Sequence, residues 1–103
     1  MAKLSLTVAP TFPASVIIPK AGAGSVTLNL TCKHRTKAAL DEFIASRADK
    51  SDADSIMAMA TGWDLEDAFT AENIELMCQN YIAAPLEIYK EYLSELTRAK
   101  AKN

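Results

Sequence analysis

Apolar and polar residues alternate with a period of two in the first third of the chain, which is typical of β-strands with one buried face. Residues 3–9 alternate leucine and valine with serine and threonine, residues 15–19 form a short β-branched run, and residues 26–33 alternate again. The glycine-rich segment 21–24 separates the last two runs. Two strands around such a loop predict an antiparallel hairpin. Because an isolated hairpin is marginal in water, its apolar face must pack on the rest of the protein.

From Thr36 onward the apolar residues recur at helical spacing, and four predicted helices each begin at a residue suited to that position. Thr36, the segment 51–54 and Thr70 supply capping oxygens for the first three helices. Pro85 takes the first position of the last helix, where its missing N–H costs nothing. The apolar residues that repeat at helical spacing are Leu40, Phe43, Ile44, Ile56, Met59, Ala60, Ile74, Met77, Cys78, Leu86, Ile88, Tyr89, Tyr92, Leu93 and Leu96.

The chain's only tryptophan lies among carboxylates, at the predicted joint between the second and third of these segments. Gly62 is expected to end the second helix in the left-handed conformation that glycine adopts most easily. Trp63 then folds back as an apolar anchor, and Asp64 caps the next helical turn. Glu66 and Asp67 would lie at the positive end of that helix dipole. These carboxylates are therefore interpreted as helix-start residues.

A length of 103 residues fits one domain around one hydrophobic core. We predict an α+β fold, in which an N-terminal antiparallel β-hairpin packs on a small bundle of about four helices. Residues 1–103 are expected to form a single domain, with a β-rich part at 1–35 and a helical part at 36–103. Cys32 and Cys78 are the only two cysteines, and without an export signal they are expected to be reduced thiols that pack as small apolar side chains.

No arrangement of residues that performs catalysis or binds a metal or a cofactor stands out. The acidic segments at 51–55 and 64–72 lack the spacing of a calcium loop, and His34 with two distant cysteines makes no zinc set. His34 is the only histidine that could activate a nucleophile, and no glycine-rich loop leads from a strand into a helix. We therefore assign no catalytic, cofactor or metal residue and expect a protein that is not an enzyme.

Charge and hydropathy argue against two further classes of partner. The formal net charge is -2 and the isoelectric point is about 5.3, whereas proteins that bind a nucleic-acid backbone usually present a basic surface. No apolar run approaches the roughly 20 residues that cross a bilayer. We expect neither nucleic acid nor membrane as a partner.

A basic cluster is the first candidate for a partner-binding surface. It crowds the predicted start of the first helix, where the helix dipole favours acidic residues. Its members are Lys33, His34, Arg35 and Lys37. Either Asp41 and Glu42 offset these charges one turn later, which is the interpretation we favour, or an acidic partner docks there.

The apolar stripe of the last helix and the methionines form the second candidate surface. Most of the stripe is expected to be core. Its tyrosine edge, or the methionines, could form an adaptable binding surface, because methionine tolerates varied partners. These candidate residues are Tyr89, Tyr92, Met57, Met59 and Met77.

Four short motifs occur in a fairly specific order and spacing. They are Lys33-His34-Arg35-Thr36, Gly62-Trp63-Asp64-Leu65, Glu72-Asn73 and Gln79-Asn80-Tyr81. In these motifs the chain resembles the tail assembly chaperones of long-tailed bacteriophages and prophages. The similarity extends over nearly the whole chain, and the family brings no catalytic motif.

The resemblance implies a protein that is made in the cytoplasm of the infected or lysogenic bacterial host and is absent from the mature virion. Such chaperones bind the tape measure protein, keep it soluble and help to recruit tail tube subunits. A tape measure protein is a long helix whose apolar faces are exposed before the tube encloses it, and such faces aggregate. A compact domain with apolar surface can mask them by helix-in-groove contact. Self-association of the chaperone as a homo-oligomer is left open.

Two other functions are alternatives: a minor structural tail protein of the virion, and a small DNA-binding regulator that uses the helices and the basic segment 98–102. The acidic isoelectric point counts against the regulator. The residues Ala101-Lys102-Asn103 allow codons that spell a slippery A-AAA-AAC run. A longer product made by translational frameshift is therefore a hypothesis that the gene sequence tests.

Overall fold

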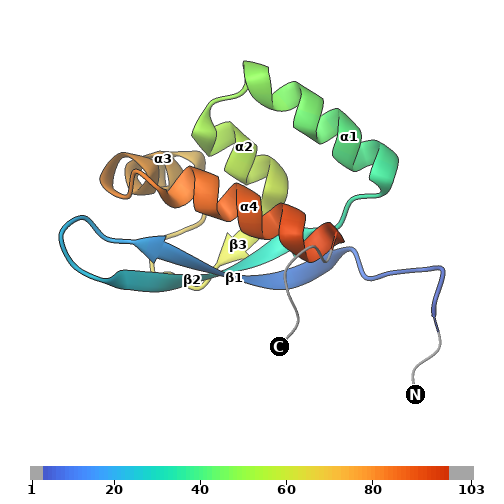
Figure 1. The fold of residues 1–103 in the computed structure, drawn as a ribbon, viewed down its shortest axis with the longest axis horizontal. Coiled ribbons are helices and arrows are strands. Elements are labelled where there is room, and N and C mark those ends of the chain that lie inside the picture. Colours follow the sequence, from blue (N-terminus) through green and yellow to red (C-terminus); the bar gives the residue numbers. More distant parts are fainter. Residues whose placement is uncertain (1–3, 98–103) are drawn as a thin grey trace.

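A three-stranded antiparallel sheet forms one layer of the protein, and four α-helices lie on one side of it (Figure 1). The structure is a computed structural model that describes residues 4–97. The elements, in chain order, are β1 (Thr11–Pro19), β2 (Ser25–Lys33), α1 (Lys37–Ser46), the 3₁₀ turn η1 (Arg47–Asp49), α2 (Asp52–Met59), β3 (Ala60–Trp63), α3 (Ala71–Asn80) and α4 (Ala84–Thr97). The predicted α+β class, with its N-terminal hairpin and four helices, is confirmed. The third strand was not predicted and falls inside the part expected to be helical.

The hairpin of β1 and β2 carries the apolar face of the sheet. The two strands pair in register from Thr11 opposite Lys33 to Pro19 opposite Ser25. Alternate residues on one face are buried against the helices, as the period of two predicts: Ala14, Val16, Ile18, Leu28, Leu30 and Cys32. In the connecting loop Gly22 and Gly24 have φ angles of 82° and 59°, a conformation that favours glycine.

Both prolines of β1 lie where the strand needs no donor. The N–H of Lys20 bonds to the carbonyl of Gly24 over 3.0 Å, and the N–H of His34 bonds to the carbonyl of Pro10 over 2.8 Å. Hydrogen-bonded pairs alternate along an antiparallel ladder. The backbone N–H and C=O groups of the even-numbered residues of β1 therefore point toward β2, and those of the odd-numbered residues point toward the free edge of the sheet. Pro13 and Pro19 are odd-numbered, so they interrupt only the unpaired edge and blunt it against pairing with other strands.

The strand predicted over residues 3–9 is wrong for its described part. Residues 4–10 have no strand conformation, and the side chains of Leu4, Leu6 and Val8 are 90%, 96% and 55% exposed. Apolar and polar residues alternate here, but the segment pairs with no strand. β2, the strand that pairs with β1, ends at Lys33, and the chain then turns away into α1. A segment with no neighbouring strand has nothing to bond to.

The helix joint predicted at Gly62 is also wrong. α2 ends at Met59, and the chain continues directly as β3, which pairs with β2 through Leu30 opposite Trp63 and Thr31 opposite Gly62. Gly62 therefore has ordinary strand geometry and no left-handed φ. The free edge of β2 offers a ladder of hydrogen bonds to β3, whose ladder has an irregularity between Thr31 and Cys32.

Asp64 does not cap a helix as predicted, because no helix begins between the end of β3 at Trp63 and Ala71. Its carboxylate instead accepts hydrogen bonds from the Asn29 backbone N–H (3.1 Å) and side-chain amide (2.8 Å). The Asn29 amide, and then the backbone N–H, lower the pKa of Asp64. Trp63 is an apolar anchor as expected: its ring lies edge-on to Phe69 at 5.1 Å, and its Nε1 donates to the carbonyl of Asp67.

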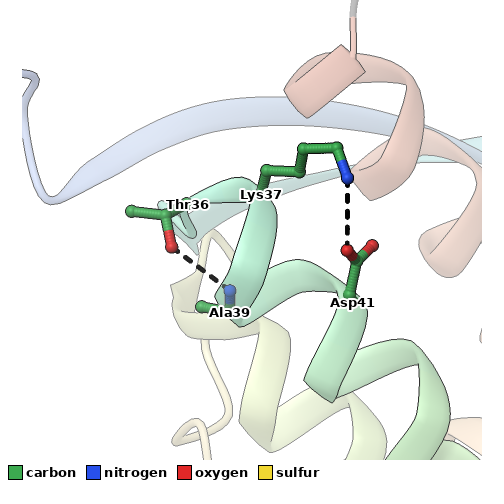
Figure 2. Close-up of polar contacts among 4 residues, drawn as sticks. All are labelled: Thr36, Lys37, Ala39 and Asp41. Carbon is green, nitrogen blue, oxygen red and sulfur yellow. Dashed lines mark hydrogen bonds and ion pairs between the residues drawn. The ribbon is translucent and has the colours of Figure 1, made fainter.

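The predicted helix starts are confirmed at Thr36, at Ser51 and at Thr70. Each hydroxyl accepts a hydrogen bond from the backbone N–H three residues later, at 3.2, 3.1 and 3.2 Å. Figure 2 shows the cap at Thr36. α4 begins at Ala84, so Pro85 occupies its second position instead of the first.

The core lies between the sheet and helices α2, α3 and α4. Its members in these three helices are Ala53, Ile56, Met59, Ile74, Ala84, Ile88 and Tyr92. α1 is the helix farthest from the sheet (Figure 1). It contributes one buried side chain, Phe43, to this core. The attachment of α1 therefore depends on the surroundings of Phe43.

Candidate binding surfaces

The side chain of Arg35 points into the protein, so it does not form one exposed surface with the other residues of the predicted basic cluster. Its Nη1 donates to the carbonyl of Ala58 in α2 at 2.7 Å and to the hydroxyl of Tyr92 in α4 at 2.8 Å. The guanidinium carbon also lies 4.6 Å from the centre of the Phe43 ring in α1. Arg35 thus connects the end of β2 to three helices by charge-assisted hydrogen bonds and a cation–π contact.

Tyr92 completes this internal node. Its side chain is 1% exposed, and its hydroxyl donates to the carbonyl of Lys33 over 2.7 Å. The Phe12 ring stacks on it and the Phe43 ring meets it edge-on, both with centroids 5.9 Å apart. Burial raises the pKa of Tyr92, and the hydrogen bond and charge of Arg35 partly offset that effect. In this conformation the Tyr92 side chain is core, so it offers no surface to a partner.

The remaining basic residues do not act as one group. Lys37 is exposed and forms an ion pair with Asp41 one turn later, with 3.4 Å between Nζ and Oδ2 (Figure 2). This pair is the local compensation by an acid that we favoured. His34 is exposed and Lys33 is half-buried. The exposed Lys37–Asp41 pair contributes little to stability, so Lys37 is available to a partner at small cost.

Tyr89 and the methionines are also separated by the fold. Tyr89 is half-buried under Arg47, whose guanidinium carbon lies 3.5 Å from the ring centre. Met59 is 1% exposed and belongs to the core, and Met57 is half-buried beside it. Met77 is half-buried in α3 and lines a surface hollow. Of the three methionines, Met77 is the one that the structure places in a groove.

That groove lies at the hairpin end of the sheet, where Val26 is 39% exposed although its neighbours Ile18 and Leu28 are buried. Its lining comes from β1, β2, α3 and the segments that follow β3 and α3. Figure 1 shows α3 and the hairpin loop at the same end of the molecule. The volume of the groove is about 220 Å³. We define the hairpin-end groove by its apolar lining, which is Ile18, Val26, Leu28, Leu65, Met77 and Tyr81.

Two further hollows adjoin the hairpin-end groove. One of about 250 Å³ shares Leu65, Met77 and Tyr81 with it and reaches Leu76 along α3. The other, of about 290 Å³, shares Tyr81 and reaches Ile82 and the hairpin loop. Several apolar side chains of this region are open to solvent. Their exposed fractions are 39% for Val26, 43% for Leu65, 59% for Leu76 and 88% for Ile82. Adjoining exposed apolar side chains of this kind mark interaction sites.

One signal for this surface is present in the sequence. Leu76 lies two residues after Ile74, about 200° around the helix, and therefore off the apolar stripe that α3 turns to the core. Leu65 and Ile82 lie outside helices and strands, where the periodicity of apolar residues predicts neither burial nor exposure. Tyr81 directly follows α3 and was noted for its motif alone.

The described residues assemble no group suited to metal binding. Across residues 4–97, no three His, Cys, Asp or Glu side chains lie close enough to hold an ion, and no helix there is long and apolar enough to span a bilayer. Cys32 and Cys78 are free thiols. Burial, with neighbouring carboxylates, raises the pKa of each to about 11, so both are protonated at neutral pH. Protonated thiols are poor nucleophiles.

The fold and these surfaces define a small α+β protein whose apolar sheet face is incompletely covered at one end. A family model of phage tail assembly chaperones matches residues 1–103, the whole chain. The chain belongs to the phage tail assembly chaperone family, as its motifs indicated. Members of this family are generally non-catalytic. No curated protein and no solved structure matches the chain.

Proposed function

We propose that this phage tail assembly chaperone is not an enzyme and acts by binding the tape measure protein through the hairpin-end groove and the two hollows that adjoin it. The observation that supports this proposal is the apolar surface at one end of the sheet, formed by half-buried Met77 and Tyr81 and by exposed Leu65, Leu76 and Ile82. A second part of the proposed role is to help recruit tail tube subunits once the tape measure protein is coated.

The physical case for a helical client rests on the shape and chemistry of the groove. An amphipathic helix places apolar anchors at positions i, i+3, i+4 and i+7, and such a row fits an apolar channel between a sheet and a helix. The three hollows all border Tyr81, so they form one surface that is larger than any single hollow. Met77 adapts to anchors of different shapes, which suits a client that offers many non-identical sites along its length.

The charge of the chain suits many copies working side by side. With a formal net charge of -2, neighbouring copies on one tape measure protein repel weakly and keep the complex in solution. We place this activity in the cytoplasm of the infected or lysogenic host, before the tube encloses the tape measure protein. A chaperone displaced by tube subunits would be absent from the virion.

Co-expression with the tape measure protein tests the proposal. The wild-type chain is expected to move most of the tape measure protein into the soluble fraction. Leu76→Glu and Ile82→Glu place charges on the apolar surface at exposed positions that the fold does not need, and each should lower the soluble amount by roughly tenfold, since desolvating an unpaired charge costs at least 1.4 kcal/mol.

Ile44→Glu is the matched control. Ile44 is 40% exposed on α1, away from the groove, so the substitution adds the same charge on a helix without touching the proposed surface. It should solubilise the tape measure protein as well as the wild type does. Equal solubility with all three variants, or none with the wild type, would refute the groove as the client site. Pull-down of tail tube subunits by the soluble complex, but not by the chaperone alone, tests the recruiting step.

A further inference from the structure

A second apolar feature lies unpartnered at the other end of the molecule. We define the N-terminal arm as residues 4–10, which precede β1. Leu4, Leu6 and Val8 alternate along it and project into solvent, with Leu6 at 96% exposure. The hydrogen bonds of residues 4–9 in the described structure run only between Ser5 and Thr7, so none of them ties these residues to the fold. The arm therefore has the alternating apolar residues of a strand, but these side chains pack against no surface of their own molecule.

The arm cannot reach the hairpin-end groove of its own molecule. Ile18 is eight residues along β1 from Pro10, which separates them by about 26 Å at 3.3 Å per residue. Leu6 is four residues from Pro10 and can lie at most about 14 Å from it. Figure 1 shows the arm at one end of β1, and α3 and the hairpin loop at the other. Each molecule therefore carries an exposed apolar arm and an open apolar groove that cannot satisfy each other.

We propose that the arm of one copy of this chain occupies the hairpin-end groove of a second copy. Alternate residues of an extended arm are about 6.6 Å apart, so Leu4, Leu6 and Val8 can enter neighbouring hollows of the apolar surface. The three hollows that border Tyr81 are such neighbours. The arm has no charged residue between Leu4 and Pro10, so burying it leaves no unpaired charge in the interface.

The contact is between two different surfaces, and so it is heterologous. One copy uses its arm and the next uses its groove, which leaves a free groove at one end and a free arm at the other. Association of this kind continues copy by copy into an open chain or closes into a ring. The arm also covers the groove while no tape measure protein occupies it, which reduces exposed apolar surface.

Sedimentation of the full chain without any tape measure protein tests this inference separately from the proposed function. The weight-average mass of the wild type should rise above the 11.2 kDa monomer with concentration. The arm variant Leu4→Ser/Leu6→Ser/Val8→Ser and the groove variant Leu65→Glu should each stay at the monomer mass. Val26→Lys is a second groove variant, and unchanged circular dichroism confirms that each variant is folded.

Mixing the two monomeric variants gives the sharpest result. The groove variant has an intact arm and the arm variant has an intact groove, so one contact per pair is restored. The mixture should form a one-to-one dimer of about twice 11.2 kDa and nothing larger. Ile17→Ser removes an apolar side chain that is 63% exposed on the open face of the sheet and should associate like the wild type.

Three outcomes would overturn the inference: a wild type that stays monomeric, an arm variant that associates like the wild type, or a mixture that remains monomeric. An arm variant that is monomeric yet solubilises the tape measure protein leaves the proposed function standing. Groove variants that fail to solubilise it, beside a monomeric wild type, support the function and remove the arm exchange alone.

Discussion

The guanidinium of Arg35 donates a 2.8 Å hydrogen bond to the hydroxyl of Tyr92, which in turn donates over 2.7 Å to the carbonyl of Lys33. Two residues that are 57 positions apart in the chain thereby fix the end of β2 against α4. Both were candidates for partner contact on the evidence of the sequence. Their mutual contact makes them part of the fold instead, and it decides how variants of the basic cluster must be interpreted.

Loss of either side chain should therefore lower stability. Arg35→Ala removes two charge-assisted hydrogen bonds and should reduce the free energy of unfolding by about 2–3 kcal/mol, and Tyr92→Phe by about 1–2 kcal/mol. The double variant should cost less than the sum, because the two residues share one bond. Urea titration measures all three values. Lys37→Ala, whose ion pair is exposed, should stay within about 0.5 kcal/mol of the wild type and is the control.

Charge reversal at the outer basic residues separates binding from folding. Lys33→Glu/Lys37→Glu leaves the Arg35 node intact, because the Tyr92 hydroxyl bonds to the backbone of Lys33. If the groove is the client site, this variant should solubilise the tape measure protein as the wild type does. A roughly tenfold loss in the folded double variant would instead favour an acidic partner at this surface. Arg35→Glu is unsuitable for this test, because it disrupts the core node.

The parts of the fold that were predictable are those in which neighbours in sequence determine the outcome. The hairpin around Gly22 and Gly24 and the caps at Thr36, Ser51 and Thr70 are of this kind. β3 depends on something remote, namely the unpaired edge of β2, and its four residues Ala60–Trp63 carry no alternation. Gly62 was interpreted as a helix end because glycine after an apolar turn is usually a C-cap. The competing ladder of hydrogen bonds with β2 was stronger.

The candidate sites depended still more on tertiary structure. The charges of Lys33, Arg35 and Lys37 look equivalent in sequence, yet one side chain points inward and one outward. The hairpin-end groove is lined by residues of β1, β2 and α3 and of the segments that follow β3 and α3, and no local pattern encodes that these residues meet. The one sign of the groove and its adjoining hollows in the sequence is Leu76, an apolar residue that lies off the apolar stripe of α3.

Glycine substitutions test the corrected joint. Gly62 has no left-handed φ, and an added Cβ meets no atom within 4 Å. Gly62→Ala should therefore be neutral or should stabilise the protein by up to about 1 kcal/mol, because alanine loses less backbone entropy on folding. Gly22→Ala is the matched comparison: at φ 82° it should destabilise by about 1 kcal/mol. Chemical denaturation of both variants checks the difference in sign. A clear loss of stability in Gly62→Ala would restore the helix-end interpretation.

Stability should fall in alkali as the buried thiol of Cys32 resists ionisation. Burial first, and the charges of Glu95 and Glu91 second, raise its pKa from 9.0 to about 11. The unfolded chain releases this proton from pH 9 upward while the folded chain holds it, so the stabilisation is complete below pH 9 and is lost as the pH rises to 11. Urea titrations across this range should show a shallower decline in Cys32→Ala than in the wild type. Equal slopes would contradict the raised pKa.

Purified virions distinguish a chaperone from a structural tail protein. If the chain coats the tape measure protein as proposed, it must leave as tube subunits polymerise, because the groove contact and the tube lining would then compete for the same apolar helix faces. Mass spectrometry of banded particles should therefore detect tube and tape measure peptides but none from this chain, while the crude lysate contains it abundantly. A fixed stoichiometry in the particle would identify a minor tail protein instead. A salt-dependent gel shift with phage DNA would favour the regulator, and the acidic charge of the chain predicts that none occurs.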